Sequence, residues 1–234
     1  MICPKCGAVI NTSNFNRCSR FPICDTVLSI EPTADIRNLD YIMFDFETTG
    51  INRKKDSIIE IGAVKVSHNK IVDKFSMLVN PGKDEYGKPI FINKKIEQIT
   101  GITNKMLLAQ KTEEEALNAF LDWIGDTELA IGQNIIAFDC HFLKACCKKY
   151  GKSFPFTSVI DTLVIARDKL ALKKKEYVKS CSQESLAAYY GFTYNAHRAL
   201  DDVEALYIIF NHLLDTAEKE HITLYPEKVA DLKI

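Results

Sequence analysis

The sequence lacks an excess of charge of either sign. Its 234 residues include 30 Lys and Arg against 31 Asp and Glu, which gives a net charge of −1. A protein that holds nucleic acid without acting on it is usually strongly basic, because neutralising phosphates dominates its affinity. Any contact between this chain and nucleic acid must therefore be local.

The sequence also lacks an apolar run of about 18 residues, which a membrane-spanning helix would need. The residues after Met1 show neither the basic start nor the apolar core of a signal peptide. We therefore expect a cytoplasmic protein that does not enter a membrane. In that compartment its 8 cysteines should be reduced or metal-bound instead of paired in disulfides.

Half of the cysteines lie close together near the start of the chain. Cys3 and Cys6, followed by Gly7, have the spacing of a zinc knuckle, and Cys18 with Cys24 completes a four-thiolate site for one structural Zn²⁺. A ribbon this small cannot fold on its own core, so the metal would supply folding free energy. The alternative is four reduced cysteines in a tail. The others, which we expect to be buried as small hydrophobes, are Cys140, Cys146, Cys147 and Cys181.

The second half of this ribbon carries a more specific pattern. Residues 15–24 read Phe-Asn-Arg-Cys-Ser-Arg-Phe-Pro-Ile-Cys, which resembles the C-terminal zinc fingers of bacterial type I topoisomerases over about residues 3–28. In that family the ribbons bind single-stranded DNA. The resemblance implies that Phe15 and Phe21 stack on bases while Arg17 and Arg20 contact phosphates. The phenylalanines could equally form the small core of the ribbon, and both interpretations stay open.

Composition and periodicity divide the chain into four parts: a zinc ribbon (1–30), a linker (31–39), a main domain (40–216) and a tail (217–234). Within the main domain, strands are expected near residues 41–46, 58–66, 71–79, 129–131 and 159–160. Helices are expected near residues 112–124, 138–150, 163–172, 183–190 and 199–214. Three strands followed by alternating helices and strands predict an α/β fold with helices covering the faces of the sheet.

Two acids stand at the end of the first strand of the main domain. Asp45 and Glu47 are two residues apart and must point to the same face of the sheet, while Phe44 and Phe46 point to the other. Charges at the end of an apolar strand are costly unless cations compensate them. The pair is therefore a candidate metal site.

Further acids occur on helices where apolar residues are expected. Asp139 shares a helical stripe with apolar side chains, and Asp202 borders the core-facing row, whereas Asp201 falls on a less apolar row. A first-turn Asp favoured by the helix dipole explains acids at helix starts, but not three acids that face inward. His197 precedes Asp202 by five residues, so it can reach the same site only from a loop before the helix.

These residues together match a family. Residues 44–50, 134–139 and 197–202 resemble the three motifs of the DEDDh exonucleases, which include the epsilon subunit of bacterial DNA polymerase III. Residues 58–64, 100–103 and 161–167 support the match, which runs from about residue 40 to 215; Gln133 departs from it, because epsilon-like chains usually have His there. The resemblance implies a ribonuclease H-like fold, a mixed five-stranded sheet with one antiparallel strand.

The resemblance also implies an activity, the stepwise 3′→5′ release of nucleoside 5′-monophosphates from single-stranded or frayed DNA ends. Asp45, Glu47 and Asp202 would bind two Mg²⁺ or Mn²⁺ ions, and Asp139 would support the second ion through water. His197 would be the general base. Residues expected to contact the terminal nucleotide are Thr48, Thr100 and Asn134.

Two other functions remain open at this point. A 3′→5′ exoribonuclease of the ribonuclease T type shares the motifs, and a nucleic-acid-binding module on an inactive nuclease fold would belong to another class. The basic cluster between residues 167 and 179 either guides a substrate strand or is a solvated helix end. The sequence names no polymerase or other protein partner.

Overall fold

The computed structural model describes residues 10–11, 17–18, 24, 36–84 and 86–232 of the chain. The chain forms two compact units, Met1–Ile36 and Arg37–Ile234, which are described separately. None of the helices in the described part is long and apolar enough to cross a membrane.

The described residues of the first unit include two short paired strands. Strand β1 (Ile10–Asn11) pairs antiparallel with β2 (Arg17–Cys18), and Cys24 is buried. Cys3 and Cys6 lie outside the described residues, so the four-cysteine zinc site stays a prediction.

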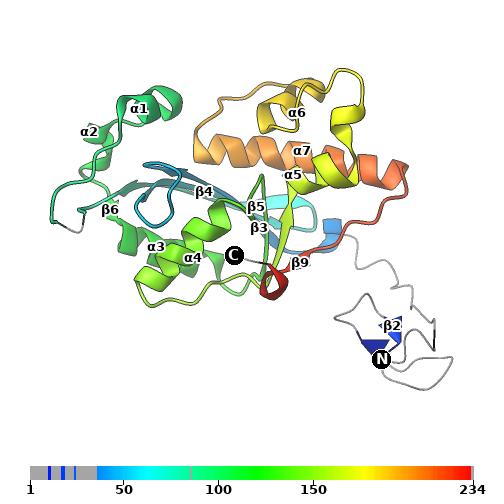
Figure 1. Ribbon diagram of the computed structural model, residues 1–234, viewed down its shortest axis with the longest axis horizontal. Coiled ribbons are helices and arrows are strands. Elements are labelled where there is room, and N and C mark those ends of the chain that lie inside the picture. Colours follow the sequence, from blue (N-terminus) through cyan, green and yellow to red (C-terminus); the bar gives the residue numbers. More distant parts are fainter. Residues whose placement is uncertain (1–9, 12–16, 19–23, 25–35, 85, 233–234) are drawn as a thin grey trace. The chain divides into compact units, whose positions relative to one another are not determined.

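The second unit is built on one sheet with the strand order β6-β5-β4-β3-β7-β8-β9 (Figure 1). Its strands are β3 (Tyr41–Thr48), β4 (Ile58–Ser67), β5 (Lys70–Asn80), β6 (Lys111–Thr112), β7 (Leu129–Gly132), β8 (Ser158–Asp161) and β9 (Glu227–Lys228). β4 runs antiparallel to both of its neighbours, and β7 and β8 run parallel to β3.

The expected count of five strands is wrong, because the sheet has seven. The two extra strands, β6 and β9, have two residues each and lie at the two edges of the sheet. β9 is also a second antiparallel strand, since it pairs antiparallel with β8. Strands this short carry no alternation in the sequence, and only their tertiary neighbours decide that they form.

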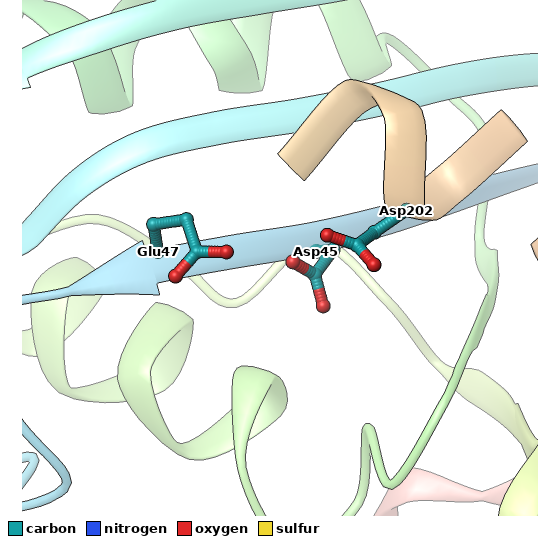
Figure 2. Close-up of side chains that lie close together, drawn as sticks. All are labelled: Asp45, Glu47 and Asp202. Atoms are coloured by element: carbon teal, nitrogen blue, oxygen red, sulfur yellow. The ribbon is translucent and has the colours of Figure 1, made fainter. Parts of the chain in front are cut away.

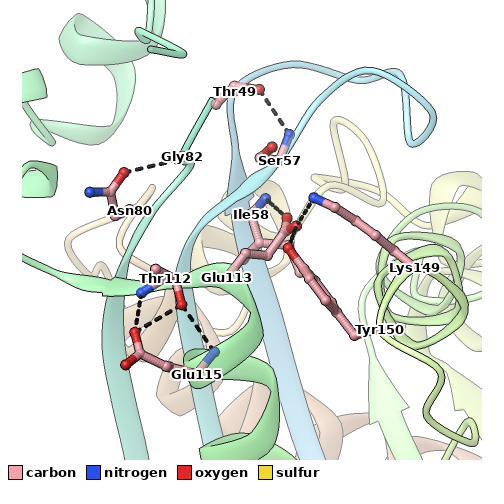
Figure 3. A network of polar contacts seen from close by, with 10 residues as sticks. All are labelled: Thr49, Ser57, Ile58, Asn80, Gly82, Thr112, Glu113, Glu115, Lys149 and Tyr150. Atoms are coloured by element: carbon pink, nitrogen blue, oxygen red, sulfur yellow. Dashed lines mark hydrogen bonds and ion pairs between the residues drawn. The ribbon is translucent and has the colours of Figure 1, made fainter. Parts of the chain in front are cut away.

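The α-helices are α1 (Lys94–Thr100), α2 (Asn104–Leu107), α3 (Glu113–Ile124), α4 (Asp139–Lys149), α5 (Thr162–Val164), α6 (Gln183–Tyr189) and α7 (Ala199–Lys219). Shorter helical turns are η1 (Ile36–Asn38), η2 (Ile165–Lys169, a π-helix), η3 (Leu172–Lys174) and η4 (Val229–Asp231). The single helix expected over residues 163–172 is therefore broken, and α1 and α2 were not expected. Thr112 caps α3 in a reciprocal capping box with Glu115 (Figure 3).

Helices cover both faces of the sheet, α3 and α4 on one face and α7 on the other (Figure 1). Phe44 of β3 packs against Phe120 of α3, with ring centroids 5.8 Å apart. On the opposite face Tyr41 meets the edge of Phe210 of α7, at 6.1 Å. Successive residues of β3 thus alternate between the two layers, and Asp45, like Tyr41, faces α7.

Two further expectations are settled by packing. The cysteines of the main domain are buried, as expected for small hydrophobes: Cys140, Cys146, Cys147 and Cys181. Beyond α7 the chain returns to the sheet as β9, and Val229 and Leu232 pack against the core cluster. The described part of the tail is thus part of the second unit.

Candidate active site

Three acids converge where β3 ends and α7 begins (Figure 2). Asp45 and Glu47 come from β3 and Asp202 from the first turn of α7, and one carboxylate oxygen of each lies within 4.8 Å of the others. Figure 2 shows their side chains gathered beside the strand. Residues 157 positions apart in sequence thereby form one cluster of oxygen ligands.

The start of α7 is fixed on the sheet by Glu60 of β4. Glu60 is 1% exposed, and its carboxylate accepts hydrogen bonds from the Arg198 guanidinium at 2.7 to 3.3 Å and from the backbone N–H of Ala199 at 3.1 Å. A bidentate Arg–carboxylate pair fixes orientation as well as distance. It therefore holds the first turn of α7, and with it Asp202, against β3.

Gly62 allows this close approach. It lies opposite Asp45 in the β3–β4 ladder, and a Cβ atom at this position would be 2.2 Å from the carbonyl carbon of Ala199. Only glycine leaves room for the backbone of α7 to lie directly on the strand.

Asp139 lies at the start of α4 and is 2% exposed. Its carboxylate accepts a hydrogen bond of 3.1 Å from the backbone N–H of Phe46, between the two acids of β3. It is not one of the three acids that share the 4.8 Å cluster. Its charge nevertheless reaches the site, since it raises the pKa of Asp45.

Burial and mutual repulsion raise the pKa of the clustered acids. The pKa of Glu47 rises to about 8, first because it is desolvated and then because Asp202 and Glu60 lie near. The pKa of Asp202 rises to about 6 through burial, opposed by the nearby Tyr194 hydroxyl and by His197. Burial, followed by the charges of Asp139, Asp202 and Glu47, raises the pKa of Asp45 well above its usual range. Bound cations would favour the ionised form of such a cluster.

His197 lies on the loop immediately before α7, where the geometry of the helix required it to be. Its φ of 67° is in the left-handed region, which is uncommon for a residue other than glycine. Its side chain is half-exposed, and Nε2 is 3.8 Å from a carboxylate oxygen of Glu184. The neighbouring Arg198–Glu60 pair anchors the backbone that holds this conformation.

A cleft of about 580 Å³ contains this site. Asp45, Glu47, Asp202, His197 and Asn134 all line it, and we call it the acidic cleft. Its other charged residues are Glu184, Arg167 and Lys173. Arg167 also pairs with its neighbour Asp168 at 2.7 Å. The structure thus brings part of the basic cluster of residues 167–179 to the edge of the site.

Three residues were expected to contact a terminal nucleotide, and only Asn134 lines the acidic cleft. The Thr48 hydroxyl donates a hydrogen bond of 2.6 Å to the carbonyl of Gly50. The Thr100 hydroxyl donates to the carbonyl of Ile96 and accepts from the N–H of Ile102. Both hydroxyls thus stabilise their own turns, and their role toward a nucleotide stays a prediction.

Several residues that build the site had no role assigned from the sequence. Asp161 accepts hydrogen bonds from the N–H groups of Asn134 and Ile136 and fixes the loop that leads to Asp139. Gln183 donates to the backbone carbonyl of Asp202 at 2.7 Å. A structural role of Glu60 could have been inferred from the sequence, because a carboxylate inside an apolar strand must have a partner. Nothing in the sequence around Gln183 indicates its role.

The chain matches known proteins over most of its length. The model of the Exonuclease family, RNase_T, matches residues 42–210. The DNA polymerase III subunit epsilon of Aquifex aeolicus is 37% identical over 177 residues, which are 75% of this chain and 80% of that protein. The PolC-type DNA polymerase III of Thermotoga maritima is 34% identical over 211 residues, 86% of this chain but 14% of that protein.

Solved structures show the same fold at lower identity. E. coli exonuclease I in complex with a dT13 oligonucleotide has a TM-score of 0.66 and 17% identity, covering 78% of this chain and 42% of that one. The chain thus spans less than half the length of exonuclease I and about a seventh of the PolC-type polymerase. The family match over residues 42–210 and the similarity to the epsilon subunit show that the chain belongs to the exonuclease family.

Proposed function

We propose that this protein is a metal-dependent 3′→5′ exonuclease that releases nucleoside 5′-monophosphates from single-stranded or frayed DNA ends. The observation that supports this most directly is the cluster of Asp45, Glu47 and Asp202 in an open cleft beside His197. A dT13 oligonucleotide is bound to E. coli exonuclease I, which shares the fold, and the epsilon subunit is part of a DNA polymerase. Both relatives favour DNA as the substrate.

The donor set fits hard divalent cations. All three clustered groups are carboxylates, the ligand type that suits Mg²⁺ and Mn²⁺. Their pKa values are raised because the charges are buried and repel one another, so a cation would restore the ionised state. A bound Mg²⁺ or Mn²⁺ would polarise the scissile phosphate and lower the pKa of the attacking water.

The chain's own residues then have distinct tasks. Asp45, Glu47 and Asp202 hold the cations, and Asp139 adds negative charge while it orients the backbone between the two β3 acids. His197 lies in the cleft with a half-exposed ring, from which it can accept the proton of the attacking water. Asn134, also in the cleft, is placed to hydrogen-bond the terminal nucleotide.

A degradation panel tests the proposal. The full chain is incubated with single-stranded DNA, duplex DNA and single-stranded RNA labelled at the 5′ end, with Mg²⁺ or with EDTA. We expect a ladder that shortens from the 3′ end, nucleoside 5′-monophosphates as product, and no cleavage in EDTA. Asp45→Asn should be inactive, whereas Asp40→Asn, the same change at an exposed residue five positions earlier, should be as active as wild type.

The panel also separates the remaining alternatives. Cleavage of RNA in preference to DNA would favour an exoribonuclease of the ribonuclease T type. Tight binding of nucleic acid without any metal-dependent cleavage would favour a non-catalytic binding module. Full activity in EDTA or in Asp45→Asn would contradict the assignment of the acids.

A further inference from the structure

A second cleft in the nuclease unit has the opposite charge. It has a volume of about 360 Å³ and lies between the loop that follows β3, the loop that follows β5 and helix α4. The basic residues that line it are Arg53, Lys54, Lys55, Lys83 and Lys149, and its acids are Asp56, Asp84 and Glu113. We call it the basic cleft.

One of these acids, Glu113, is buried and held by a network of polar contacts (Figure 3). Glu113 is 8% exposed and accepts hydrogen bonds from Lys149 Nζ at 2.6 Å, from the Tyr150 hydroxyl at 3.0 Å and from the N–H of Ile58 at 3.3 Å. Figure 3 shows the three donors converging on its carboxylate. This acid is thereby fully engaged, and it neutralises only Lys149.

The other two acids bind backbone groups of their own loops. Asp56 accepts from the N–H of Asn52 at 2.8 Å and from the Thr49 hydroxyl at 3.1 Å. Asp84 accepts from the N–H groups of Tyr86 and Lys88 at 2.9 and 2.8 Å. These contacts shape the loops but leave both carboxylates charged, so the basic cleft has an excess of positive charge, with five basic against three acidic side chains.

Within the described part of the chain, four cations of the basic cleft form no ion pair with an acid. No ion pair joins the side chain of Arg53, Lys54, Lys55 or Lys83 to a carboxylate of any described residue. Residues 53–55 are exposed and consecutive, so their charges gather in one place. Such uncompensated charge attracts a polyanion.

The basic cleft and the acidic cleft share no lining residue, but a loop and a helix lead from one to the other. The loop that carries Arg53 begins after Thr48, the last residue of β3 and the neighbour of Glu47. Helix α4 begins at Asp139, beside the acids, and ends at Lys149, in the basic cleft, a distance of about 15 Å along its axis.

Two exposed aromatic side chains on the loop that follows β5 favour the binding of an unpaired strand over a duplex. Tyr86 lies in the turn that Asp84 stabilises, and it is 78% exposed. Phe91, a few residues later, is 62% exposed. Exposed aromatic rings between lysines are typical of surfaces on which unpaired bases stack.

We propose that the basic cleft binds the sugar-phosphate backbone of single-stranded nucleic acid, a few nucleotides from the 3′ end that lies among the acids. This inference rests on the proposed function, because it takes the bound strand to be the substrate. Another cleft, of about 630 Å³, offers no comparable surface, since its charged residues are Asp40, Asp126 and Glu128 against Lys65 alone. A polyanion would be repelled there.

The test removes three of the cations together. Arg53→Ala/Lys54→Ala/Lys55→Ala is compared with Lys70→Ala/Lys219→Ala/Lys228→Ala, a control with the same change in charge at exposed residues that line neither cleft. The first variant should raise KM for single-stranded DNA of about 20 nucleotides at least tenfold, because three phosphate contacts are lost. Its kcat/KM for a dinucleotide, which cannot reach the basic cleft, should stay within about twofold of wild type.

Binding gives a second readout that does not depend on cleavage. In an Asp45→Asn background, fluorescence anisotropy measures the affinity for the same strand at several salt concentrations. The basic-cleft variant should flatten the slope of log K against log salt by about 2, since each phosphate contact on a single strand contributes about 0.7. Tyr86→Ala should weaken binding while leaving the slope unchanged.

The two proposals fail in different ways. Equal KM values and equal salt slopes for the basic-cleft variant and its lysine control would overturn this inference and leave the exonuclease intact. A wild-type chain that binds the strand with the expected slope but never cleaves it would overturn the proposed function instead.

Discussion

Neutralising one acid of the active site should stabilise the protein while it abolishes activity. Asp202→Asn is the cleanest case, because the amide has nearly the same shape and Gln183 can still donate to the backbone carbonyl of residue 202. The pKa of Asp202 is raised from 3.8 to about 6 in the folded chain. The folded state therefore keeps a proton that the unfolded state releases, and stability falls as pH rises through that window.

The size of the effect follows from the two pKa values. Their difference corresponds to about 3 kcal/mol once pH exceeds both of them, and this is an upper value because the cluster can relax. We expect Asp202→Asn to gain about 1–3 kcal/mol at about pH 8 in EDTA, a rise in Tm of about 3–9 °C for a domain of this size. At about pH 4.5 the gain should shrink to about a third.

Thermal unfolding of the metal-free proteins at several pH values measures this. Asp201→Asn is the matched control, since Asp201 lies one residue away, accepts a hydrogen bond from Asn195 and is outside the three-acid cluster. It should show no such gain. Mg²⁺ should raise the Tm of wild type more than that of Asp202→Asn, because a ligand that binds the folded state more tightly stabilises it more. A variant less stable than wild type at about pH 8, or a gain independent of pH, would refute the reasoning.

Three further predictions concern the proton acceptor and the first unit. His197→Ala should lower kcat by about 10²–10⁴-fold with Mg²⁺ binding retained; steady-state rates and Mg²⁺-dependent Tm shifts measure this, and a variant within a few-fold of wild type would exclude the role. Metal analysis of the purified chain should find one tightly held Zn²⁺ that Cys24→Ser loses. Deleting residues 1–30 should raise KM for long single strands with kcat nearly unchanged, as expected for a lost tethered site. Unchanged KM for long and short strands would mean that the ribbon does not hold substrate.

The parts of the site that follow from local geometry could be predicted from the sequence. A strand alternates its side chains, so Asp45 and Glu47 had to share a face, and they do. Helix geometry required His197 to precede α7, and it lies on the loop before Arg198. Both inferences need only the type of element and not the arrangement of its neighbours.

The supports of the site could not be predicted, because they depend on which distant elements meet. Glu60 and Arg198 are 138 residues apart, and their pairing follows from α7 crossing the sheet at Gly62. The short helices α1 and α2 have too few residues to show a periodicity, although Asn93 and Thr103 cap them in the ordinary way.

The near-zero net charge hides a separation of charges, from which we infer how substrate and cation would bind. A phosphodiester that enters the acidic cleft alone meets Asp45, Glu47 and Asp202 in a poorly solvated setting, where repulsion is far stronger than in water. A bound divalent cation would replace this repulsion by attraction, so it should tighten the binding of the nucleic acid. Because coupling of this kind is reciprocal, the nucleic acid must tighten the cation by the same factor. The basic cleft does not need a bound metal ion to attract phosphates, since its positive charges are the Arg and Lys side chains of the chain itself. We therefore expect that a strand can bind in the basic cleft before the metal ions bind. Its 3′ end would then be at a high local concentration beside the acids.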